Sequence, residues 1–266
     1  MTLRAVSIAL TLACALSVAP GAWAQGTPEQ SPVWLQLQET VFGKRPINPG
    51  GKQVVQLHLN SRAEDAATVP ILVRTALPQT SASYVKRLWL VIDNNPSPIG
   101  VVFHFTPESG QADIETRVRI ENSTFVRAVA ETSDGELFMD AKPIYAAGGC
   151  SGPSLADEVA MANLGNMRMR LEDRLELNKP VQAKLMVSHP NFSGLSKLNS
   201  YTQYVKRIVV SYAEREILTA DVDFTISENP TFRFYFVPTE HGELKAQIID
   251  TNDLKFETTL SIKPES

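Results

Sequence analysis

The stretch ENSTF at residues 121–125 recurs as ENPTF at residues 228–232, and each copy is followed after six residues by a Thr-x-x-Gly-Glu-Leu motif. The two motifs occupy residues 132–137 and 239–244. A second related pair lies upstream, YVKRL at 84–88 and YVKRI at 204–208. The offset is 120 residues for the upstream pair and 107 for the downstream pair, so the second copy is 13 residues shorter between the motifs. Two blocks in the same order, separated by one gap, indicate an internal duplication.

Each copy has the pattern of an all-β unit. Its apolar runs are short, rich in Val, Ile, Phe and Thr, and separated by Asn, Pro, Gly and Asp at turn positions. Residues 232–236 (FRFYF) alternate between an apolar and a mixed face, as a half-buried strand does. The expected strands are 70–76, 85–92, 100–105, 113–120 and 125–131 in the first copy, and 182–188, 205–212, 217–224, 231–236, 243–250 and 255–262 in the second. About seven strands in about 100 residues predict an immunoglobulin-like β-sandwich for each copy.

The N-terminus has the three parts of a secretory signal peptide. Arg4 precedes an apolar run over residues 5–18, and small residues follow at Ala22 and Ala24. We therefore predict that residues 1–24 are removed and that the chain is exported to the periplasm. Cys14 raises the alternative of a lipidated anchor, but the residue three positions before it is Thr11 rather than an apolar residue, and the apolar run continues past it.

Composition limits the classes of partner. After cleavage the chain has 24 basic and 29 acidic residues, a net charge of −5 with histidine neutral. A mildly acidic chain without a concentrated basic patch argues against nucleic-acid binding. The apolar run at the N-terminus is shorter than the roughly 20 residues that a membrane span needs, and we expect no other span.

The predicted layout is a signal peptide at 1–24, a first sandwich at 25–145, an arm and linker at 146–166, and a second sandwich at 167–266. The arm and linker belong to neither copy and contain several glycines. Residues 31–42 fit either a short helix or an edge strand that packs on the first sandwich.

Cys150 is the one cysteine that remains after cleavage, whereas exported proteins usually hold their cysteines in disulfide pairs. It stands between Gly148, Gly149 and Gly152, which have no Cβ and give the backbone access to positive φ. We expect these glycines to make the arm flexible and Cys150 to face outward. A five-residue reach from Tyr145 would carry the sulfur at most about 17 Å.

Four other readings of Cys150 compete. It can be a buried apolar residue, an incidental residue of a linker, a blue-copper ligand or a catalytic nucleophile. A copper site needs a His and a Met shortly after the cysteine, yet the first of each are Met161 and His189. A catalytic cysteine needs a histidine that activates it, and no histidine is adjacent in sequence. The four histidines are His58, His104, His189 and His241.

Without a local activator, the pKa of Cys150 is expected near the reference value of about 8.5. The thiol would then react mainly inside a partner's active site. An accessible thiol on an arm between two stable scaffolds, with no catalytic group of its own, is typical of a covalent carrier rather than an enzyme.

The chain resembles the sulfur-oxidation carrier family SoxYZ, here as a single-chain SoxY–SoxZ fusion. The first sandwich resembles SoxY and the second resembles SoxZ. SoxY-like stretches are 68–70 (TVP), 84–86 (YVK), 103–107 (FHFTP), 116–119 (TRVR), 129–135 (VAETSDG) and 148–150 (GGC), and SoxZ-like stretches are 188–190 (SHP), 194–195 (GL), 204–205 (YV) and 229–232 (NPTF).

The resemblance implies two packed immunoglobulin-like domains, with Cys150 holding thiosulfate-derived sulfur intermediates as thioconjugates. It implies no cofactor other than the sulfur bound to Cys150, and it implies periplasmic sulfur-oxidising enzymes and c-type cytochromes as partners. Fused versions are similar to a group associated with quinoprotein dehydrogenases, so a dehydrogenase that uses pyrroloquinoline quinone is a candidate partner. The alternative function is a docking or assembly module for such a dehydrogenase, with the cysteine secondary.

Two departures from the SoxY pattern bear on the arm. Ser151 replaces a glycine of the usual Gly-Gly-Cys-Gly-Gly ending, and the chain continues into a second domain instead of stopping. The arm is therefore tethered at both ends. Covalent linkage makes domain association intramolecular, so we predict a monomer, with a Cys150 disulfide dimer under oxidation.

Overall fold

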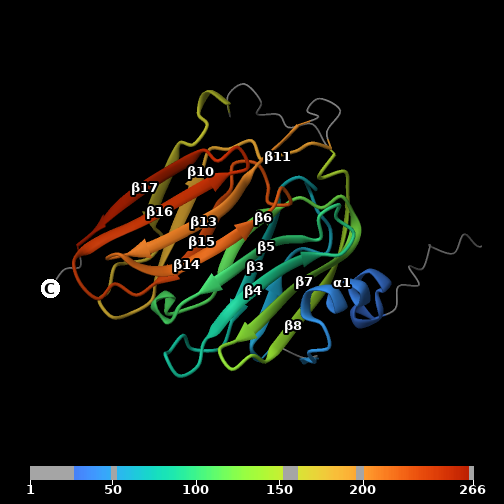
Figure 1. Cartoon of the computed structure of the whole chain (residues 1–266), viewed down its shortest axis with the longest axis horizontal. Coiled ribbons are helices and arrows are strands. Elements are labelled where there is room, and N and C mark those ends of the chain that lie inside the picture. The colour runs from blue at the N-terminus through green and yellow to red at the C-terminus, as the bar shows by residue number, and fades with distance from the viewer. Residues whose placement is uncertain (1–26, 49–52, 152–160, 196–200, 264–266) are drawn as a thin grey trace, which may run out of the picture.

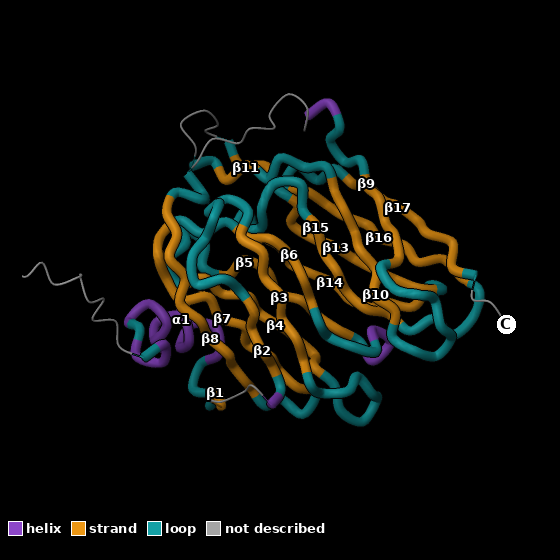
Figure 2. Tube along the Cα trace, turned by 180° about the vertical axis from the view of Figure 1, so that it is seen from behind, coloured by secondary structure: helices purple, strands orange, loops and turns teal. Residues whose placement is uncertain are grey.

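The computed structural model describes residues 27–48, 53–151, 161–195 and 201–263. The predicted signal peptide, Cys14 and Gly152 lie outside these residues. The described chain forms two layers of β-sheet, seen from opposite sides in Figures 1 and 2. The immunoglobulin-like, mostly β architecture predicted from the sequence is confirmed.

The larger layer has nine strands and the smaller layer has six. In spatial order the larger sheet contains β1 (Ile47–Asn48), β8 (Leu137–Ala147), β7 (Asn122–Thr132), β4 (Val85–Ile92), β5 (Ile99–Phe105), β14 (Arg215–Val222), β13 (Val205–Tyr212), β16 (Gly242–Asp250) and β17 (Lys255–Ile262). The smaller sheet contains β2 (Val55–His58), β3 (Val69–Thr75), β6 (Ile114–Val118), β15 (Thr231–Phe236), β10 (Val181–Val187) and β9 (Met167–Leu171). A separate pair, β11 (Phe192–Ser193) and β12 (Thr202–Gln203), lies beside them.

Both sheets run without interruption from the first half of the chain into the second. In the larger sheet β5 pairs antiparallel with β14, from Phe105 opposite Leu218 to Val101 opposite Val222. In the smaller sheet β6 pairs with β15 at Glu115 and Arg233. The two predicted sandwiches are therefore joined edge to edge through shared backbone hydrogen bonds, which the sequence did not predict.

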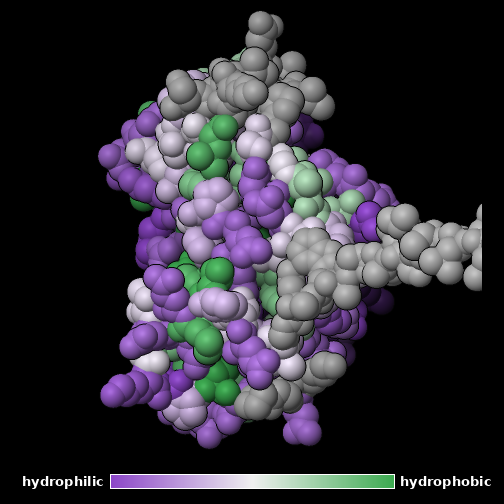
Figure 3. All heavy atoms as spheres, turned by 90° about the vertical axis from the view of Figure 1, so that its right-hand side faces the viewer, coloured by the Kyte–Doolittle hydropathy of each residue, from purple (hydrophilic) through white to green (hydrophobic). Residues whose placement is uncertain are grey.

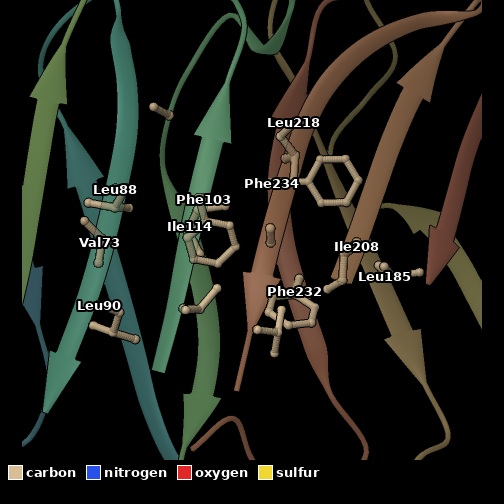
Figure 4. Close-up of a cluster of buried hydrophobic side chains, with 14 of the residues drawn as sticks. Val73, Leu88, Leu90, Phe103, Ile114, Leu185, Ile208, Leu218, Phe232 and Phe234 are labelled. Carbon is tan, nitrogen blue, oxygen red and sulfur yellow. The ribbon is translucent and has the colours of Figure 1, made fainter. Parts of the chain in front are cut away.

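One hydrophobic core fills the space between the layers and crosses this junction. Figure 4 shows Leu88, Leu90 and Phe103 from the first half in one row with Ile208, Phe232 and Phe234 from the second half. Phe103 and Phe232 meet edge to face, with ring centroids 6.2 Å apart. The junction is consequently stabilised by apolar burial as well as by strand pairing.

The segment that the sequence left undecided is a helix, α1 (Pro32–Phe42), preceded by the 3-10 turn η1 (Pro28–Gln30). The Ser31 hydroxyl caps it by accepting from the Trp34 N–H, and Pro32 occupies its first turn, where a missing N–H costs nothing. Trp34 and Phe42 pack on Trp89, on the outer face of the larger sheet. This explains the continuous apolar run at the end of β4. Leu88, Leu90 and Ile92 lie in the core between the two sheets, whereas Trp89 and Val91 pack under α1 on the opposite face.

The molecular surface at the α1 end is mixed. Among the coloured residues of Figure 3, hydrophilic side chains predominate, with smaller apolar groups between them. Val33 and Leu35 are among the exposed apolar residues of α1.

The predicted strands 85–92, 205–212, 231–236 and 255–262 are confirmed with the same bounds, and the others are confirmed with shifted ends. β8 was missed, because Pro143 and several polar residues interrupt its apolar pattern. Pro143 pairs with Phe125 of β7, whereas β1 covers only Leu137 and Phe138 on the other side of β8. A proline is tolerated at such an edge, since its nitrogen has no ladder bond to donate.

Candidate functional site

The segment that carries Cys150 is packed against the protein along residues 119–121. β8 ends at Ala147, and the next two N–H groups continue its pairing: Gly148 donates to the Glu121 carbonyl at 2.7 Å and Gly149 donates to the Ile120 carbonyl at 3.0 Å. Cys150 follows directly, and it lies close enough to Arg119 for the charges of the two side chains to interact. We call residues 148–151 in this arrangement the docked segment.

Each of the two described glycines has a local reason to be there. Gly148 has φ of +76°, a region that favours glycine. Gly149 lies so close to the neighbouring chain that an added Cβ would be 2.1 Å from the Ala66 carbonyl oxygen. Their role in flexibility stays a prediction, and in the docked segment they permit a turn and a close backbone approach.

The Glu121 carboxylate holds the end of the docked segment. Its Oε2 accepts from the N–H groups of Cys150 at 2.8 Å and Ser151 at 3.0 Å, and its Oε1 accepts from the Ser151 hydroxyl at 2.7 Å. From the other half of the chain, the Ser193 hydroxyl donates to the Cys150 carbonyl at 2.8 Å. Both halves of the molecule therefore hold the docked segment, and hydrogen bonds to a carboxylate are among the stronger ones.

The Cys150 side chain is buried, with 2 % of its surface exposed. Burial raises the pKa of the thiol to about 12, the negative charges of Glu121 and Asp223 act in the same direction, and Arg119 opposes them. The expectation of an outward-facing thiol with an ordinary pKa is thus wrong for this arrangement. The groups that bury Cys150 come from segments distant in sequence, which the flanking glycines do not reveal.

Arg119 is a buried cation at the junction of the two halves, with 6 % of its surface exposed. Its Nη1 donates to the carbonyls of Asn191, Phe224 and Ile226 at 2.8–2.9 Å, and its Nη2 donates to the Pro190 carbonyl at 3.4 Å. All four acceptors belong to the second half of the chain. Among the described residues no carboxylate forms a salt bridge with Arg119.

The histidines are not assembled around the cysteine. His104 faces Asp221 at 3.0 Å across the β5–β14 pair, and His58 and His241 are exposed. His189 is fully buried: its Nδ1 accepts from the Asn191 N–H, its Nε2 lies 3.6 Å from Oδ2 of Asp250, and burial lowers its pKa. No hydrogen bond joins a histidine to Cys150 in the described part of the chain.

The described residues were also searched for metal-binding clusters and membrane-spanning helices. They contain no group of three or more His, Cys, Asp or Glu side chains placed to hold a metal ion. None of their helices is long and apolar enough to cross a membrane.

Sequence reasoning missed Arg119, Glu121 and Ser193 as parts of the site. Arg119 shares a face of its strand region with Arg117 and Glu115, a pattern typical of a solvated surface. It is buried only because the loops around Asn191 and Phe224 cover it. No signal within residues 113–120 could have revealed that cover.

The fold and the site define a class: a β protein of two joined sandwiches that holds one cysteine at their junction. Comparison with protein families matches residues 38–150 to SoxY, sulfur oxidation protein SoxY, and residues 167–261 to SoxZ, sulphur oxidation protein SoxZ. The chain is a SoxY–SoxZ fusion and belongs to this family of sulfur carriers.

Solved structures that align with parts of this chain include the sulfur carrier protein SoxY from Chlorobium limicola f thiosulfatophilum. It is 21% identical, with a TM-score of 0.35, over 42% of this chain and 89% of that one. A superoxide reductase (neelaredoxin) from Ignicoccus hospitalis is 14% identical, with a TM-score of 0.32, over 37% of this chain and 94% of its own. A β-glycosidase from Bacteroides vulgatus is 9% identical, with a TM-score of 0.25, over 79% and 24% of the two chains. No curated protein matches the chain.

Proposed function

We propose that this chain is a periplasmic carrier that holds thiosulfate-derived sulfur intermediates covalently on Cys150 while partner enzymes act on them. The observation that carries the proposal is that the SoxY match ends at Cys150, the cysteine that both halves of the molecule hold at their junction. The partners are periplasmic sulfur-oxidising enzymes and c-type cytochromes, and the carrier has no catalytic site of its own.

The docked thiol is unreactive because burial, together with the charge of Glu121, raises its pKa. With a pKa of about 12, only about one thiol in 100,000 is ionised at pH 7. The thiolate is the nucleophile in every exchange that would load sulfur onto the cysteine. Loading therefore requires the docked segment to leave Glu121 and Arg119, after which the thiol regains an ordinary pKa.

The glycines supply the other half of this proposal. Gly148, Gly149 and Gly152 allow the backbone to turn freely once the hydrogen bonds to Ile120 and Glu121 break. The carrier then alternates between a docked state, in which Cys150 is shielded, and a released state, in which it enters a partner's active site. The working unit is a monomer, since both halves belong to one chain.

The buried thiol also favours a second candidate. In that case the chain is a docking or assembly module for a quinoprotein dehydrogenase that uses pyrroloquinoline quinone, and Cys150 is a packing residue of the domain junction. The observation in its favour is the 2 % exposure of Cys150.

A Cys150→Ser variant separates the two candidates. Serine retains the backbone hydrogen bonds of the docked segment and is close in size. As a carrier the variant loses all sulfur-dependent electron transfer, measured as cytochrome reduction in a periplasmic extract supplied with thiosulfate. As a docking module the variant gives the same cytochrome reduction as the wild-type chain and retains its partner in a pull-down. That result would overturn the carrier proposal.

A further inference from the structure

His189 begins the turn of the second half that reaches the docked segment, and its imidazole is fully buried. Its backbone is fixed by Asn229, because the His189 N–H donates to Oδ1 of Asn229 and the Asn229 N–H donates to the His189 carbonyl. Nδ1 of the ring accepts from the backbone N–H of Asn191 at 3.1 Å. Asn191 has φ of +46°, a conformation that asparagine tolerates. The imidazole thus closes a turn in the way that an Asn or Asp side chain closes an Asx turn.

The turn fixes the protonation state of the ring. A backbone N–H can only donate, so Nδ1 is the unprotonated nitrogen and the neutral ring carries its proton on Nε2. Nε2 has no hydrogen-bond partner among the described residues and lies 3.6 Å from Oδ2 of Asp250. A second proton can be added only at Nδ1, where it would face the Asn191 N–H. Protonation of His189 therefore breaks the hydrogen bond of the turn.

The Asp250 carboxylate favours the same movement of the ring. It is fully buried, and it accepts from the Gln203 side chain and from two backbone N–H groups of the turn that follows it. His189 is the only basic group within salt-bridge distance of Asp250 in the described ranges. Attraction between buried opposite charges would draw a protonated ring towards Asp250 and away from Asn191.

The surroundings of His189 keep the ring neutral at pH 7. Burial lowers its pKa, while Asp250 and the Asn191 side chain act in the opposite direction. In the described part of the chain, Asp250 of β16 is the one charged group within 4 Å of the ring nitrogens. β12 presents the neutral Gln203 to that carboxylate, the segment before β15 presents a neutral asparagine to the His189 backbone, and Arg119 reaches only the carbonyls of the turn. The ring therefore gains its second proton only in acid.

One peptide group joins His189 to the junction of the two halves. The peptide plane of residues 190–191 points its N–H at the His189 ring and its carbonyl at Nη2 of Arg119, 3.4 Å away. The next carbonyl along the chain accepts from Nη1 of the same guanidinium at 2.8 Å. Two residues further on, the Ser193 hydroxyl donates to the Cys150 carbonyl. Because a peptide unit is planar, a rotation that moves its N–H moves its carbonyl as well. A break at the ring is thus transmitted towards Arg119 and Cys150.

We propose that His189 is a positioning residue for the docked segment: the neutral ring keeps the turn closed against Arg119 and Cys150, and protonation at Nδ1 opens the turn and releases the segment. This inference rests on the proposed alternation between docked and released states, and it adds the signal that shifts their balance. The Asn191 side chain stays bonded to the carbonyls of residues 226–227, so the turn opens at one peptide group and the surrounding fold is retained.

Acid should therefore weaken docking. The ordinary pKa of histidine is 6.5 and the docked value is lower, so docking is unaffected above about pH 6.5 and weakens progressively as the pH falls below it. The measurement is hydrogen exchange at the Gly149 and Cys150 amides, with each rate divided by that of the same amide in an unstructured peptide at the same pH. This protection should fall about tenfold between pH 7.5 and 5.0, the effect of one lost buried hydrogen bond. Its midpoint should coincide with the titration of the His189 ring nitrogens in NMR.

Two substitutions separate the titration of the ring from its shape. His189→Asn places an amide oxygen near the position of Nδ1, keeps an acceptor for the Asn191 N–H and cannot be protonated at these pH values, so protection should stay high throughout. His189→Gln places its amide near the position of Nε2 and leaves the turn without an acceptor, so protection should be low throughout. His104→Asn, in the exposed pair with Asp221, is the control and should keep the wild-type response to acid.

Protection that does not change with pH in the wild-type chain would overturn the assignment, and this result needs no variant to fold. An acid response that persists in His189→Asn would also overturn it, because the response would then belong to Glu121 or another carboxylate. All measurements use the chain without bound sulfur. Absence of sulfur on the native protein would overturn the proposed function without affecting this result, whereas pH-independent docking would leave the carrier function intact.

Discussion

The backbone N–H of Cys150 donates a 2.8 Å hydrogen bond to Oε2 of Glu121, so the residue proposed to carry sulfur is held by a carboxylate 29 positions earlier in the chain. Burial is the main cause of the raised pKa of the thiol, and the charge of the same carboxylate adds to it. Glu121 therefore both fixes the docked segment and suppresses the reactivity of its cysteine. Removing the Glu121 carboxylate should therefore both release the docked segment and lower the pKa of the Cys150 thiol, and both effects make the thiol more reactive.

Glu121→Gln should expose and activate Cys150. The amide keeps one acceptor oxygen, but it loses the negative charge and turns N–H donors towards the donors of Ser151. We expect the alkylation rate of Cys150 by iodoacetamide at pH 7.5 to rise about tenfold or more. Glu136→Gln, at an exposed position, is the control and should leave the rate unchanged. Equal rates in both variants would show that Glu121 does not hold the segment.

Gly149→Ala should release the segment by steric conflict. The new Cβ would lie 2.1 Å from the Ala66 carbonyl oxygen, a backbone atom that cannot move aside cheaply. Gly148→Ala is the matched control, because its added Cβ meets nothing within 4 Å, although its φ of +76° strains an alanine. Alkylation of Cys150 should accelerate more in Gly149→Ala than in Gly148→Ala. The opposite ranking would mean that backbone strain, not close packing, controls docking.

Docking should depend on pH through the thiol. The docked pKa is about 12 and the ordinary value is 9.0, so the docked segment favours the protonated form. Its stability is fully present below pH 9 and is lost progressively as the pH rises from about 9 towards about 12. The alkylation rate of the wild type should therefore keep rising with pH beyond 9, whereas Glu121→Gln should level off closer to 9. A wild-type plateau at pH 9 would indicate a thiol that is already released.

The buried pair of Arg127 and Asp93 should be important for stability. The guanidinium donates to both carboxylate oxygens at 2.7 and 2.5 Å and lies 4.3 Å from the centre of the Trp34 ring, so it links β7 to α1. Arg127→Met leaves the buried Asp93 carboxylate without its cationic partner, with only the Ser31 hydroxyl donating to it, and should cost about 3–5 kcal/mol in chemical unfolding. Lys206→Met, which breaks an exposed pair with Asp253, is the comparison and should change little. A similar loss of unfolding free energy in both variants would show that the buried Arg127–Asp93 pair contributes no more to stability than an exposed pair does.

The continuous sheets predict that the two halves unfold together. The pairing of β5 with β14 and the contact of Phe103 with Phe232 cross the junction, so neither half can unfold without exposing core of the other. Calorimetry should give one transition, and a protease site introduced between Ser151 and Met161 should leave the cleaved halves together in gel filtration. Two separate transitions, or separation after cleavage, would mean that the halves are independent.

The repeat and the alternation within each copy were enough to predict the fold class and most strands, because local patterns decide which face of a strand is apolar. β8 was not predicted, because a proline such as Pro143 is unusual within a strand and occurs mainly at sheet edges. The edge-to-edge junction was not predicted, because no local sequence pattern shows which strand of one copy pairs with which strand of the other. Cys150 could be chosen from composition, but its burial depends on Glu121, Arg119 and Ser193, which only the tertiary structure brings to it.

The central claim is that Cys150 carries sulfur, and the most direct test is the intact mass of the mature protein purified from its native periplasm without reductant, measured before and after reduction. We predict a mass excess that reduction removes and that maps to the peptide containing Cys150, in steps of a sulfur atom or a thiosulfate group. A bare thiol that stays bare after growth on reduced sulfur compounds would contradict the account.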